Sequence, residues 1–67
     1  MTRRDYILLA AAIKAARAEV LAKEPDESHA ELIYGIEYAT DFIGDALATD
    51  NPRFKKHTFR TACGITE

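Results

Sequence analysis

The sequence predicts an all-α fold: a long antiparallel helical hairpin with a short third helix at its C-terminal end. Two long stretches carry apolar residues at spacings of three and four, which is the period of a helix and not of a strand. A short segment containing a proline separates these stretches, so they should pack side by side in opposite directions. An Asn-Pro pair then breaks the pattern before a third, shorter stretch that ends at a glycine.

The central helix is expected at about residues 28–49. Ser28 followed by Glu31 is the pattern of a capping box at a helix start. Gly35 and Gly44 lie inside this helix, where each costs about 1 kcal/mol relative to alanine. We therefore expect these glycines to let the first helix approach closely. The apolar stripe that should face the core consists of Leu32, Ile36, Ala39, Ile43 and Ala46, and it is broadened by Ile33, Thr40 and Leu47.

The first helix is expected at about residues 3–23, because Thr2 and Asp5 form a capping pattern before an alanine-rich apolar run. Residues 24–27 contain Pro25, which cannot continue a helix. After the central helix we expect a turn at residues 52–54. A short third helix should follow at about residues 56–63, stopped by Gly64.

The length of 67 residues bounds the chain to one domain, residues 1–67. A domain of this size buries only about 60% of its unfolded surface and is marginal alone. Each hairpin also has more apolar surface than one short helix can cover. We therefore expect a homodimer that completes a helical bundle.

The single cysteine excludes an intramolecular disulfide and fits a reducing compartment. No stretch approaches the ~20 apolar residues of a membrane span. A basic start before an apolar run resembles a signal peptide, but Asp5, Lys14 and Arg17 interrupt that pattern. We expect a cytoplasmic protein that does not contact a membrane.

Charge is distributed in three blocks along the chain. Residues 1–23 carry five basic and two acidic side chains, residues 24–50 carry eight acidic side chains and no lysine or arginine, and residues 51–66 carry four basic side chains and no acidic one. The first interpretation is that an acidic middle helix packs between two basic flanks. The second is that a ridge formed by Glu37, Asp41 and Asp45 faces a basic partner, which would relieve the repulsion along it.

No motif in the chain indicates an enzyme or a cofactor. A Gly-rich phosphate loop, a zincin motif, paired cysteines and a nucleophile elbow are all missing from the sequence. His29 and His57 are expected to be solvated or capping residues, and Cys63 to be a small buried apolar group. We therefore expect a non-enzymatic protein with no metal and no cofactor.

Two sets of residues are candidates for binding. The first is a mixed face of the central helix that would contact a protein partner, because tyrosine is a frequent interface anchor. Its candidate binding residues are Tyr34, Tyr38, Asp41 and Asp45, and Phe42 lies on the same face. The helical spacing of the two tyrosines fits the core of a dimer equally well. The second is a basic patch that would contact nucleic acid if the last two helices act as a helix-turn-helix, although the net charge of −2 and the acidic central helix oppose this. It comprises Arg53, Lys55, Lys56 and Arg60.

The Met-Thr-Arg-Arg-Asp-Tyr opening runs into an alanine-rich helix, and the run Asp-Asn-Pro-Arg-Phe at residues 50–54 is followed by Phe-Arg at 59–60 and Ala-Cys-Gly at 62–64. These two ends of the chain resemble a group of small, uncharacterised bacteriophage and prophage proteins. That group usually has an acidic residue where this chain has Lys55, so the cap of the last helix is lost here. The resemblance implies a small phage protein in the cytoplasm of a bacterial host, and it implies no chemistry for particular residues. From the candidate surfaces, we expect this protein to act by binding a host, defence or regulatory protein.

Overall fold

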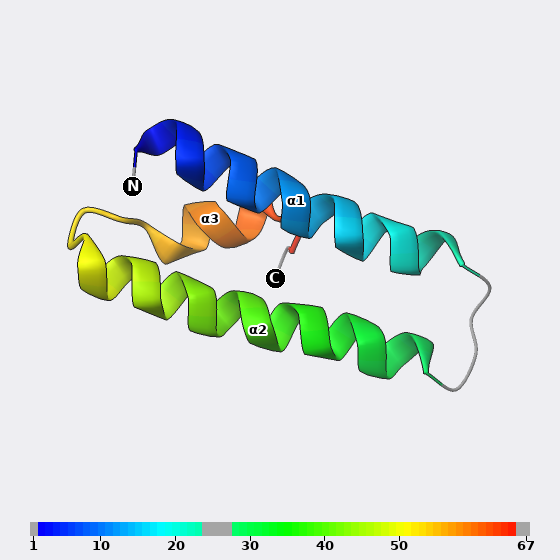
Figure 1. The fold of residues 1–67 in the computed structure, drawn as a ribbon. Coiled ribbons are helices and arrows are strands. Elements are labelled where there is room, and N and C mark those ends of the chain that lie inside the picture. The colour runs from blue at the N-terminus through cyan, green and yellow to red at the C-terminus, as the bar shows by residue number, and fades with distance from the viewer. Residues whose placement is uncertain (1, 24–27, 66–67) are drawn as a thin grey trace.

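Three helices make up the fold in the computed structural model, which describes residues 2–23 and 28–65. Helix α1 spans Arg3–Ala22, α2 spans His29–Asp50 and α3 spans Lys56–Ala62. The two long helices run antiparallel, and α3 folds back between them, so that each helix contacts both of the others (Figure 1). The predicted all-α fold of two long helices and one short helix is confirmed. The predicted break at residues 24–27 lies outside the described residues.

The start of α1 has the predicted capping box. The hydroxyl of Thr2 accepts a hydrogen bond from the backbone N–H of Asp5 at 3.3 Å, and the carboxylate of Asp5 accepts from the N–H of Thr2 at 2.9 Å. These hydrogen bonds, the one from the Thr2 backbone first, hold the pKa of Asp5 below its usual value. The backbone N–H groups at the start of a helix have no acceptor within the helix, and these two hydrogen bonds provide side-chain acceptors for those of Thr2 and Asp5.

The predicted capping box at the start of α2 is not formed. Ser28 occupies the N-cap position, but its side chain makes no capping hydrogen bond. Its backbone is already helical, with φ −90° and ψ −11°. A capping serine needs an extended backbone to turn its hydroxyl towards the first turn, which explains the difference.

The core lies where α3 meets the two long helices. The buried apolar side chains are Ala10, Leu47, Phe59, Cys63 and Ile65, and the side chains packed against them are Tyr6, Leu9, Ile13, Ile43 and Phe54. On α2 the buried line runs through Thr40, Gly44 and Leu47, whereas Leu32, Ala39 and Ala46 are exposed. The predicted stripe is therefore right for Thr40 and Leu47, which are buried, and for Ile43, which packs against the core, but it is wrong for the three exposed residues. Thr40 enters the core because its hydroxyl donates to the carbonyl of Ile36 at 2.7 Å.

The two glycines of α2 differ in their surroundings. Nothing lies within 4 Å of the place where a side chain on Gly35 would begin, so the predicted close approach is wrong at this position. Gly44 is buried, and a Cβ there would lie 3.1 Å from Cγ of Lys56. The element that approaches Gly44 closely is thus α3 and not α1.

Gly35→Ala is expected to stabilise the protein by about 1 kcal/mol, because alanine is the better helix former and the site has room for its methyl group. The measurement is the free energy of unfolding from urea denaturation. Gly44→Ala is the matched comparison, since its methyl group must displace Lys56. A loss of stability in the Gly35 variant would show that another surface covers this position.

The turn into α3 is closed by Asn51. Its side-chain oxygen accepts from the backbone N–H of Arg53 at 3.1 Å, and its carbonyl accepts from that of Phe54 at 2.9 Å. The helix then ends in a Schellman motif, in which Ile65 N–H donates to the Arg60 carbonyl and Gly64 N–H donates to the Thr61 carbonyl, both at 3.0 Å. The positive φ of Gly64, 82°, confirms its predicted role as the helix stop.

Lys55→Asp is expected to stabilise the protein by about 1 kcal/mol. Lys55 is the N-cap of α3, and its side chain makes no capping hydrogen bond, whereas aspartate can accept one from the first turn. The melting temperature of this variant should rise, and that of Lys55→Ala should change little. A fall in the melting temperature with aspartate alone would mean that the negative charge, and not the lost lysine, opposes folding.

Candidate functional site

Three aromatic side chains form a ladder on the outer side of α2. Tyr34, Tyr38 and Phe42 follow one another at intervals of four residues and are 68%, 54% and 62% exposed. The ring centroids of Tyr34 and Tyr38 are 5.7 Å apart, and those of Tyr38 and Phe42 are 5.1 Å apart. We call these three residues the aromatic face. Contacts between neighbouring rings restrict the conformations of these side chains, while more than half of each side chain stays exposed.

The aspartates predicted to share this surface turn towards α3 instead. Asp45 forms an ion pair with Lys56, with 2.8 Å between Oδ1 and Nζ, and Asp41 pairs with Arg60. The hydrogen bond with Asp45 is the main reason that the pKa of Lys56 is raised. The structure thus separates the four predicted residues, with the tyrosines pointing outwards and the aspartates bound to α3.

The third member of the acidic ridge, Glu37, pairs with Arg17 of α1. The guanidinium of Arg17 donates twice to Glu37 Oε2, each at 3.2 Å, and once to the carbonyl of Gly64 at 3.1 Å. Arg17 therefore ties α2 to the end of the chain. All three acidic residues of the ridge have basic partners within the fold, as the first interpretation of the charge blocks predicts.

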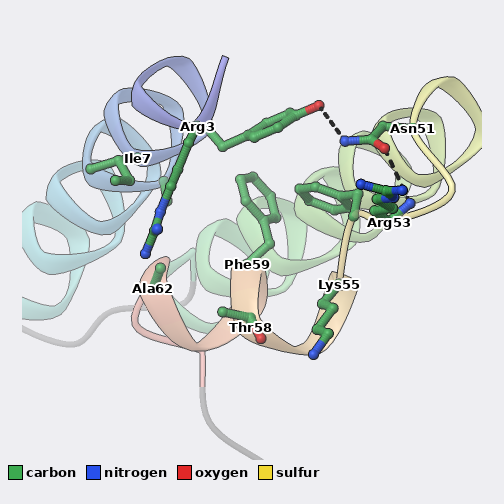
Figure 2. A pocket seen from close by; sticks show the side chains of 11 residues that line it. Arg3, Ile7, Asn51, Arg53, Lys55, Thr58, Phe59 and Ala62 are labelled. Atoms are coloured by element: carbon green, nitrogen blue, oxygen red, sulfur yellow. Dashed lines mark hydrogen bonds between the residues drawn. The ribbon is translucent and has the colours of Figure 1, made fainter. Parts of the chain in front are cut away.

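The predicted basic patch is also divided. Lys56 and Arg60 face the acidic ridge, while Arg53 and Lys55 lie at the edge of a hollow between α1 and α3 (Figure 2). Arg3 of α1, which the sequence analysis did not single out, lines the same hollow. Its position depends on how α1 packs beside α3, so spacing along the chain could not predict it.

The hollow has a volume of about 680 Å³ and an apolar, partly aromatic floor. Tyr6 and Phe54 are in tilted contact at 5.0 Å between ring centroids, and Phe54 and Phe59 at 5.4 Å. The amide of Asn51 donates to the hydroxyl of Tyr6 at 3.5 Å and closes one side (Figure 2). The hollow thus combines an apolar base with a polar and cationic rim.

The remaining candidate groups show no catalytic arrangement. Cys63 is buried, as predicted, and burial raises the pKa of its thiol. Within residues 2–23 and 28–65, no three His, Cys, Asp or Glu side chains are placed to hold a metal ion. None of the helices described is long and apolar enough to cross a bilayer.

Comparison of the chain with protein-family models, with curated proteins and with solved structures found no match in any of the three.

Proposed function

We propose that the chain is a small, non-enzymatic protein-binding module of phage or prophage origin. It acts in the bacterial cytoplasm on a host, defence or regulatory protein, and the resemblance at the two ends of the chain supports this setting. The observation that carries the proposal is the aromatic face, three large side chains that are each more than half exposed on one side of one helix. An exposed apolar patch of this kind is typical of a protein-interaction site.

The spacing of the aromatic face favours a groove on the partner. Side chains four residues apart form a straight ridge along a helix, and such a ridge inserts into an apolar groove of another protein. Tyrosine suits this position because its ring is apolar and its hydroxyl forms hydrogen bonds at the rim. The exposed carboxylate of Glu31, three residues before Tyr34, favours lysine or arginine along the edge of that groove.

Nucleic-acid binding is the less favoured function, since Lys56 and Arg60 already pair with aspartates of α2. Lysine and arginine side chains that contact phosphates displace the counterions bound to the nucleic acid. Two of the four basic side chains predicted for this role are already in ion pairs within the fold. The acidic side of α2 also lies directly beside α3 and would repel a phosphate backbone. This alternative predicts binding that nuclease abolishes.

The homodimer is part of the same proposal and uses a different surface. By helical periodicity, the exposed Leu32, Ala39 and Ala46 lie on the flank of α2 that is turned away from α3. The exposed Ala12 and Ala16 lie on the corresponding flank of α1. Small residues allow close packing. A second copy would bind on this flank, with its α1 antiparallel to α2 of the first copy. In this orientation the basic ends of α1 would lie beside the acidic ends of α2.

Light scattering coupled to gel filtration tests the dimer. The expected mass is twice the 7.5 kDa of one chain, and Ala39→Glu should return it to one chain mass by burying an unpaired charge. A monomeric wild-type protein at high micromolar concentration would exclude this dimer. It would leave the aromatic face untouched, because that face lies on another side of α2.

The protein-binding function is tested by quantitative affinity capture from bacterial lysate, with and without nuclease. The test variant carries Tyr34→Ala, Tyr38→Ala and Phe42→Ala. The control carries Leu8→Ala and Leu21→Ala, which remove two exposed apolar side chains of α1. Alanine preserves helix propensity in both variants.

The expected result is one protein that the wild type and the α1 variant retain, that the triple variant loses, and that nuclease does not release. Equal recovery by all three proteins would reject the aromatic face as the binding site. Recovery that disappears with nuclease would replace the proposal with the nucleic-acid function.

A further inference from the structure

The hollow between α1 and α3 has the composition of a ligand site that is separate from the aromatic face. A volume of about 680 Å³ is within the range of small-molecule pockets, which is about 300–1,000 Å³. Its floor contains Tyr6 and Ala10 of α1, Phe54 of the connection before α3, and Phe59 of α3. These side chains present carbon to the hollow and favour an apolar ligand body.

Three cationic side chains line the same hollow, and among the described residues no carboxylate does. Arg3 extends from α1 across one end towards Ala62, while Arg53 and Lys55 come from the connection before α3 (Figure 2). None of the three forms an ion pair with a residue in the described part of the chain, unlike Arg17, Lys56 and Arg60. Like charges around a shared hollow repel one another, and an anion would relieve that repulsion.

We propose that this hollow binds a small organic anion: an aromatic ring or short acyl chain that ends in a carboxylate. The apolar body lies on Phe54 and Phe59, and the carboxylate accepts hydrogen bonds from the guanidinium of Arg3. Arginine suits this role because its planar fork donates to both carboxylate oxygens. The Tyr6 hydroxyl accepts from Asn51, so its own hydrogen is directed to another acceptor, such as the ligand.

The experiment is a titration of the ¹⁵N-labelled full chain with 4-phenylbutyrate, followed by amide chemical shifts. The neutral 4-phenylbutan-1-ol has the same ring and chain and no charge. Inorganic phosphate has charge and no apolar body. Saturable shifts centred on Ala10, Phe54 and Phe59 are expected with 4-phenylbutyrate. The alcohol should bind at least about tenfold more weakly, and phosphate more weakly still.

Arg3→Gln and Arg4→Gln form a matched pair for the same titration. Both remove one positive charge from exposed positions in the first turn of α1, but only Arg3 lines the hollow. Arg3→Gln should weaken binding of 4-phenylbutyrate about tenfold, and Arg4→Gln should change it by less than about twofold. Unchanged amide shifts elsewhere in each variant confirm that the fold is kept.

Three results would overturn the proposal. One is equal affinity for the acid and the alcohol, another is equal affinity in the two arginine variants, and the third is an absence of saturable shifts around the hollow. None of these results bears on the protein-binding function, because the aromatic face lies on the outer side of α2.

Discussion

Phe59→Ala is expected to leave most of the chain unfolded at 25 °C. Phe59 is only 4% exposed and contacts Phe54, which in turn contacts Tyr6, so its ring links α3 to the start of α1. Removing a buried phenylalanine ring costs about 3–5 kcal/mol. That loss is comparable with the whole stability of a domain this small. The measurement is the urea dependence of the far-ultraviolet circular dichroism.

Phe42→Ala is the control for this prediction, since it removes the same ring from a position that is 62% exposed. It should change the free energy of unfolding by less than about 1 kcal/mol. Similar losses in both variants would mean that the aromatic face is buried, either in this chain or in a stable dimer. A stable Phe59 variant would contradict the position of α3.

Arg60→Glu is expected to destabilise the protein by about 2 kcal/mol, because it places a third carboxylate beside Asp41 and Asp45. The value lies below the cost for a fully buried pair, since the Asp41 side chain remains 42% exposed. Thermal unfolding at low ionic strength measures this loss. Combining it with Asp41→Lys should restore more than half of the lost stability.

Arg53→Glu is the comparison for the charge reversal, because Arg53 is exposed and forms no ion pair with the described residues. Arg53→Glu should change the stability measured by thermal unfolding only slightly. If the double variant Arg60→Glu with Asp41→Lys is no more stable than Arg60→Glu alone, the side chains at positions 41 and 60 do not interact with each other in the folded protein. The acidic ridge would then be open to a basic partner after all.

The helices could be predicted from the sequence because their signals are local. The capping box of Thr2 and Asp5, the break at Asn51 and the stop at Gly64 each involve neighbouring residues. The buried line of α2 could be predicted only in part, because apolar residues flank it on both sides and the predicted stripe is wider than the surface that is buried. The ion pairs with α3 accompany the rotation that turns Thr40 and Leu47 inwards and leaves Leu32 outside.

Contacts that are distant in sequence account for the other differences. Ile65 follows the helix stop and has no periodic partner, yet the Schellman motif returns it to the core, where it is 3% exposed. The hollow likewise depends on Arg3 lying beside α3. Tyr34 and Tyr38 could be identified from their shared helix face. Phe42 lies on that face too, as its spacing of four residues from Tyr38 predicts.

Site-specific photocrosslinking in bacterial cells tests the aromatic face most directly. The photoreactive amino acid p-benzoylphenylalanine replaces Tyr38 in one protein and the equally exposed Leu8 of α1 in the other. The account predicts one discrete protein adduct from position 38, with a partner other than this chain, and little or none from position 8. Equal adducts from both positions, an adduct from position 8 alone, or none from position 38 would contradict it.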